Sequence, residues 1–116
     1  MAVTVQDAVA TFKARAAAEA EERASLAASV RQQLPAVATT LRERGAIEVW
    51  LFGSMATGRV HESSDVDIAV WGVPDDEVAT LSYELTLRLG RHVDVVPLEG
   101  APRLLVTRVR EEGVRL

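Results

Sequence analysis

Cysteine is absent from the 116-residue chain. Disulfide bonds, thiol chemistry and cysteine-ligated zinc sites are therefore excluded together. No apolar run approaches the ~18 residues of a membrane-spanning helix, so no span is expected. The first residues include an early acid and lack the short apolar core of a signal peptide. These absences lead us to expect a cytoplasmic protein.

Positive charge is also scarce, since 13 Lys and Arg residues stand against 17 Asp and Glu residues, for a net charge of −4. A general nucleic-acid-binding protein normally carries a basic face, so DNA is not an expected partner. Nucleotide binding stays open, because a bound metal ion can supply the positive charge. With 12.6 kDa and 48% hydrophobic residues, we expect one modest core.

Residues 5–44 have a helical pattern. Thr4 and Asp7 are spaced as a capping box, with Asp in place of the commoner Glu. Apolar residues then follow one another at steps of three and four, which is the spacing of one helix face. Pro35 should kink this helix or begin a second one. The apolar stripe is mostly alanine before Val30, and we expect residues 5–30 to pack back on the domain or, preferably, to bind a protein partner.

The remainder of the chain alternates strand and helix patterns, which predicts a small α/β domain. The expected strands are 46–52, 65–71 and 92–97; the expected helices are 75–89 and 102–112, and a turn at 53–58 opens a short helix.

Two carboxylates lie within the second expected strand. Side chains two apart on a strand project from the same face, so Asp65 and Asp67 point together. Two like charges held side by side are costly unless a cation lies between them. Oxygen ligands favour Mg²⁺, which commonly brings nucleotide phosphates with it. A solvated strand-start cap is the alternative for Ser63, Ser64 and Asp65, but it does not explain Asp67 inside a hydrophobic strand.

The first expected strand ends in Gly53-Ser54. Glycine lets the backbone approach a phosphate without a Cβ in the way, and the Ser54 hydroxyl can donate to a phosphate oxygen. A plain strand-to-helix turn is the alternative. The acids that follow ten residues later favour the phosphate-binding interpretation.

The chain contains Gly-Ser, then ten residues, then Asp-x-Asp. This pattern resembles the signature of the DNA polymerase β-like nucleotidyltransferase superfamily. With Asp94 in His-Val-Asp-Val-Val and the closing stretch from Ala101, the chain is most similar to the minimal nucleotidyltransferases, the antitoxin partners of HEPN toxins. The resemblance covers roughly residues 30–116. It implies a polymerase β-type fold with a three-stranded mixed sheet packed by helices. We therefore divide the chain into an N-terminal helical extension, 1–30, and a nucleotidyltransferase domain, 31–116.

The resemblance also implies an activity: Mg-dependent transfer of AMP from ATP to a tyrosine hydroxyl of a HEPN-type ribonuclease toxin, which is thereby neutralised. Two Mg²⁺ ions are expected. The residues assigned to catalysis and metal binding are Asp65, Asp67 and Asp94, and those assigned to the nucleotide are Gly53, Ser54, Arg59 and Ser64. For Asp94 a solvating charge on an edge strand is the alternative, and for Arg59 an ordinary surface arginine.

One departure from the family pattern concerns Met55, where members often carry a basic residue. A phosphate contact is then missing, and Arg59 is the candidate substitute. Met55 favours a second hypothesis, a catalytically weak module that neutralises its partner sterically, whereas retention of all three acids opposes it. A third hypothesis, a small-molecule nucleotidyltransferase of the aminoglycoside type, requires dimerisation to build an acceptor site.

Overall fold

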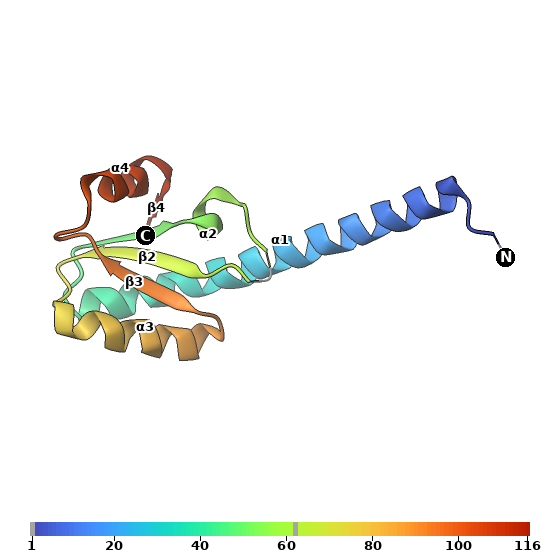
Figure 1. The fold of residues 1–116 in the computed structure, drawn as a ribbon. Coiled ribbons are helices and arrows are strands. Elements are labelled where there is room, and N and C mark those ends of the chain that lie inside the picture. Colours follow the sequence, from blue (N-terminus) through green and yellow to red (C-terminus); the bar gives the residue numbers. More distant parts are fainter. Residues whose placement is uncertain (1, 62) are drawn as a thin grey trace.

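The computed structural model describes residues 2–61 and 63–116. Four helices and four strands follow one another along the chain (Figure 1): α1 (Val5–Glu43), β1 (Glu48–Phe52), α2 (Ser54–Thr57), β2 (Val66–Trp71), α3 (Asp75–Leu89), β3 (Val93–Pro97), α4 (Arg103–Glu112) and β4 (Val114–Arg115).

The strands form one mixed sheet in the order β3-β2-β1-β4. β2 runs parallel to β3, whereas β1 is antiparallel to both of its neighbours, β2 and β4. The expected mixed α/β fold is confirmed, but the expected count of three strands is wrong by one. The missed strand is only two residues long and too short to show an alternating pattern.

The sheet is covered on both faces. Helices α1 and α3 lie on one face and α4 lies on the other (Figure 1). Alternate residues of each strand therefore enter different layers. The larger core, on the α1 and α3 face, includes Leu41, Ile68 and Leu85, all fully buried. A smaller cluster on the α4 face is built around Ala69, Leu98 and Val109.

Helix α1 is continuous over 39 residues, with Pro35 inside it. The expectation that Pro35 begins a second helix is therefore wrong. A proline removes one hydrogen bond and crowds one carbonyl, a cost of about 3 kcal/mol. Here Val30, Leu34, Val37 and Leu41 are buried on both sides of the proline. Their packing stabilises the helix across that interruption.

The N-terminal part of α1 extends away from the rest of the molecule (Figure 1). Its side chains are exposed up to Leu26 and Ala27, which are the first to be partly buried. Burial thus begins near the expected boundary at residues 30 and 31. The division into an extension and a domain stays a prediction, because one helix runs through it.

Three large apolar side chains lie on this projecting segment: Val5, Val9 and Phe12 are 81%, 45% and 73% exposed. They continue the helix stripe that is buried further along at Val30 and Leu34. The segment therefore carries an apolar face with nothing packed on it among the described residues. Neither α1 nor any other helix within residues 2–61 and 63–116 has the apolar length needed to cross a bilayer.

Candidate active site

The turn after β1 brings backbone against a carboxylate. Gly53 has φ 74° and ψ −155°, a conformation that is essentially restricted to glycine. A Cβ at this position would overlap Oδ2 of Asp67. Glycine is thus required at position 53 for two reasons, its backbone angles and the space left by the missing Cβ. The expected Gly-Ser turn and the expected acid are in direct contact.

Asp67 and Asp94 are neighbours across the sheet. They are register partners on the parallel strands β2 and β3, and Phe52 is the partner of Asp67 on β1. Register partners on adjacent strands project from the same face of a sheet, so Asp94 shares a face with Asp67. Asp65 lies one residue before β2 begins.

Electrostatic crowding is strongest at Asp67, which is half-buried. Burial, followed by the negative charges of Asp94 and Asp65, raises the pKa of Asp67 above its usual range, and His92 opposes the rise. The carboxylate with the least access to solvent is therefore also the one flanked by two like charges. A cation bound among the three would relieve this repulsion.

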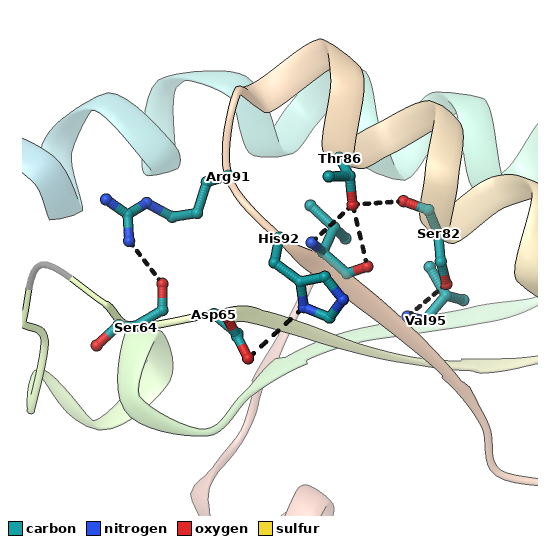
Figure 2. Close-up of polar contacts among 8 residues, drawn as sticks. Ser64, Asp65, Ser82, Thr86, Arg91, His92 and Val95 are labelled. Atoms are coloured by element: carbon teal, nitrogen blue, oxygen red, sulfur yellow. Dashed lines mark hydrogen bonds and ion pairs between the residues drawn. The ribbon is translucent and has the colours of Figure 1, made fainter.

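His92 is a neighbour of Asp65 that sequence analysis did not select. Its Nδ1 lies 3.5 Å from Oδ2 of Asp65 (Figure 2), and both side chains are more than half exposed. An exposed pair of this kind contributes little to stability. Its consequence is local, because it orients the Asp65 carboxylate beside the start of β2.

Strand β3, which carries Asp94, is an edge strand with N–H groups that β2 cannot satisfy. Two hydroxyls of α3 accept them (Figure 2): Val93 N–H donates to Thr86 Oγ1 at 2.9 Å, and Val95 N–H donates to Ser82 Oγ at 3.0 Å. These bonds block edge pairing and hold Asp94 from both sides. The spacing of four between Ser82 and Thr86 on a helix was the available sequence signal.

Ser64 forms hydrogen bonds that hold its own loop in this structure. It is 4% exposed, and its hydroxyl accepts from the His61 N–H at 2.8 Å. Its carbonyl accepts from Arg91 Nη1 at 2.7 Å (Figure 2), which links the loop to the start of β3. A contact between Ser64 and nucleotide stays a prediction.

The other expected nucleotide residues line one cleft of about 380 Å³. Gly53, Ser54 and Arg59 form one wall, and α4 supplies the other, including Arg108, which sequence analysis did not select. Met55 is instead 3% exposed and packs in the larger core. The Met55 side chain therefore points into the core and away from the cleft, whereas Arg59 lines the cleft.

The donor set suits a hard cation. Within residues 2–61 and 63–116, no three His, Asp or Glu side chains already converge as a complete metal cage. Mg²⁺ does not require one, because it is usually held by one or two carboxylates together with substrate phosphates. Asp67 and Asp94 on adjacent strands, next to a turn that can approach phosphate, match that requirement.

Residues 36–116 match the family described as "Polymerase beta, Nucleotidyltransferase". The chain belongs to this family. The resemblance stated from the Gly-Ser turn and the acids is confirmed. The matched region holds the whole sheet and every candidate site residue, whereas the projecting part of α1 lies outside it.

Three relatives illustrate the similarity. Protein adenylyltransferase MntA of Shewanella oneidensis is 37% identical over 71 residues, 59% of this chain and 51% of that protein, so the chain spans about half the length of this curated relative. The solved structure of a toxin-antitoxin with AMP-PNP is 30% identical with a TM-score of 0.63, covering 68% of each chain. A structure of a candidate minimal nucleotidyltransferase is 31% identical with a TM-score of 0.70, covering 78% of this chain and 95% of that one.

The contact between Gly53 and Asp67 can be tested with a pair of glycine variants. Gly53→Ala and Gly58→Ala both place a Cβ on a residue with positive φ, but nothing lies within 4 Å of the new atom at Gly58. We expect Gly53→Ala to lower the free energy of unfolding by about 1–3 kcal/mol. Of the two variants, we expect only Gly53→Ala to lose nucleotide binding. Denaturant titration and equilibrium nucleotide binding measure the two effects. Equal behaviour of the two variants would contradict the assignment.

The crowding of Asp67 predicts an unusual pH dependence. Because its folded-state pKa is raised above the ordinary value of 3.8, Asp67 destabilises the folded state increasingly as the pH rises from 3.8 to that raised value, and fully above it. We expect Asp67→Asn to melt at a higher temperature than the wild type near neutral pH, and the difference to vanish as the pH falls below 3.8, where the carboxyl becomes protonated in both states.

Melting temperatures recorded against pH in metal-free buffer check this, with Glu111→Gln as an exposed control on α4. A less stable Asp67→Asn at neutral pH would show that the carboxylate has a stabilising partner, contrary to the expectation.

Proposed function

We propose that this chain is a protein adenylyltransferase antitoxin, which transfers AMP from ATP to a tyrosine hydroxyl of a HEPN-type ribonuclease and so neutralises it. The observation that carries the proposal is the contact of the Gly53 turn with Asp67, beside Asp94. This arrangement joins a turn that can approach phosphate to carboxylates that need a cation. A relative 37% identical over part of its length is named an adenylyltransferase, and one 30% identical is described as a toxin-antitoxin with AMP-PNP.

Asp65, Asp67 and Asp94 are the residues that would hold Mg²⁺, with two ions expected. When bound, the ions would offset the negative charge of the triphosphate and lower the pKa of the acceptor hydroxyl. Gly53 lets the backbone approach the phosphates, and Ser54 donates its hydroxyl to one of them. Asp94, which is exposed whereas Asp67 is half-buried, accepts the proton of the tyrosine hydroxyl.

In this reaction the acceptor oxygen forms a bond to the α-phosphorus of ATP, and the bond from that phosphorus to the pyrophosphate oxygen breaks. Pyrophosphate leaves with the electron pair of the broken bond, and the acceptor proton passes to the carboxylate. The chain's task is mainly positioning, since the two reacting groups must be held in line.

A steric module without transfer is the second candidate. Burial of Met55, where a basic residue is common, is the observation that favours it. The carboxylates weigh against it, because a steric partner gains nothing from a half-buried Asp67 whose charge is repelled by Asp94 and Asp65.

The first experiment is measurement of the intact mass of a HEPN-type ribonuclease co-expressed with this chain. With Mg-ATP we expect the intact mass to rise by one or more AMP units. Asp65→Asn/Asp67→Asn should lower transfer at least ~100-fold, because Mg²⁺ loses two of its carboxylate ligands and no longer offsets the charge of the phosphates. EDTA should have the same effect. Glu111→Gln is the matched control. A stable complex with no added mass, with cells still protected by the double variant, would establish the steric module instead.

We further propose that the projecting part of α1 binds the same partner. Val5, Val9 and Phe12 form an exposed apolar stripe that continues the buried face of α1, and it lies outside the region matched by the family. Exposed apolar side chains in a row on one helix are typical of a helix-in-groove contact.

Two substitutions that introduce the same charge test this surface. Phe12→Glu lies on the stripe and Ala18→Glu on the opposite face of α1, and both positions are exposed. We expect Phe12→Glu to weaken the complex by about 2 kcal/mol, roughly 30-fold, because it places a charge in an apolar contact. Ala18→Glu should leave it unchanged. Affinity measured by calorimetry decides, and equal affinities for both variants would exclude α1 as the contact.

A further inference from the structure

The cleft beside the Gly-Ser turn has a second wall, which is formed by α4 and contains none of the residues selected from the sequence. Ser54 and Arg59 face Leu105, Arg108 and Glu112 of α4 across a volume of about 380 Å³. Positions 105, 108 and 112 follow one another at steps of three and four, so they lie on one face of the helix. That face is directed to the cleft.

The position of Arg108 is determined by the packing of its neighbours. Val109 is fully buried under the sheet, and Leu105 and Val106 pack against the same small cluster with Ala69 and Leu98. Helix α4 therefore cannot rotate without exposing this cluster. Arg108 is carried beside it to the rim of the cleft.

Arg108 and Arg59 are cations without partners in the described part of the chain. On the same side of the molecule, Arg110 pairs with Glu48 at 3.7 Å and Arg115 lies over the ring of Trp50 at 5.8 Å. Neither Arg59 nor Arg108 has an ion pair or hydrogen bond within residues 2–61 and 63–116. Glu112 is the carboxylate of the lining, and it is bonded to neither arginine. In a chain with net charge −4, two unpaired arginines in one cleft indicate an anionic ligand.

We propose that Arg108, together with Arg59, binds the β- and γ-phosphates of the nucleotide, and that this cleft holds the polyphosphate tail. The proposal rests on the proposed function. Gly53 connects the two parts of the site, because its backbone abuts Asp67 and also lines the cleft. The α-phosphate then lies over the carboxylates, and the tail passes Gly53 and Ser54 to reach the two arginines.

Binding of nucleotides to the whole chain tests the assignment directly. Calorimetry with Mg²⁺ would compare a non-hydrolysable ATP analogue with AMP for the wild type, Arg108→Ala, Arg108→Lys and Arg103→Ala. Arg103 is the matched control, since it is exposed on the same helix and is not part of the cleft.

We expect Arg108→Ala to weaken binding of the ATP analogue roughly 10- to 100-fold, because it removes a charge-assisted contact. Binding of AMP, which lacks the distal phosphates, should change less than about twofold. Arg108→Lys should recover part of the loss, since it keeps the charge but not the planar fork. Arg103→Ala should match the wild type, and all melting temperatures should agree.

Two results would overturn the inference and are distinguishable. If the wild type binds the ATP analogue and Arg108→Ala binds it equally well, the cleft does not hold the tail, and the proposed function still stands. If the wild type binds no nucleotide, both proposals fail. An equal loss of AMP and ATP binding in Arg108→Ala would assign the arginine to another part of the nucleotide and would also contradict the proposal.

Discussion

The approach of the Gly53 backbone to the Asp67 carboxylate is the contact on which the rest of the site depends. It joins two motifs that lie ten residues apart and brings the Gly-Ser turn next to the acids. A side chain at residue 53 would separate them. Asp67 is half-buried here and lies near two other carboxylates. Its burial and their negative charges raise its pKa, and a bound cation would relieve the repulsion. The folded chain thus retains an electrostatic cost that a bound metal ion would remove.

The sheet supports this arrangement through its register. Parallel pairing of β2 with β3 places Asp94 opposite Asp67, and the hydroxyls of Ser82 and Thr86 hold the outer edge of β3. The large core under α1 and α3 makes that register specific, because a shift by one residue would exchange buried valines for the acids. Stability and the candidate site are therefore consequences of the same alternation of side chains along each strand.

Two helices add to what the sheet provides. Helix α4 closes the opposite face of the sheet and carries Arg108 to the cleft, so that positive charge gathers there in an acidic protein. The projecting part of α1 presents an apolar face away from the site. The reaction and the binding of the partner would then be located at separate ends of this protein. A partner could then stay bound while its acceptor side chain enters the site.

Much of the fold followed from local pattern. The span predicted for α3, 75–89, is the observed one, and the strands around Asp67 and Asp94 were located to within one or two residues, because periodicity and glycine turns are local properties. Of the two outcomes expected at Pro35, a second helix is wrong, because buried side chains on both sides stabilise one continuous helix. Strand β4 was missed, because it exists only where β1 offers a free edge to two residues.

The candidate site divides in the same way. Gly53, Ser54, Asp65, Asp67 and Asp94 could be selected from the sequence alone, because carboxylates in hydrophobic strands and a Gly-Ser turn are anomalies visible in the letters. His92, Ser82, Thr86 and Arg108 could not, because each is ordinary in its own segment and acquires a role only from what lies opposite it. The sequence by itself determined which residues are the candidates for the chemistry. Tertiary structure decided which side chains hold them in place and which face the cleft, because those contacts join segments that no local pattern connects.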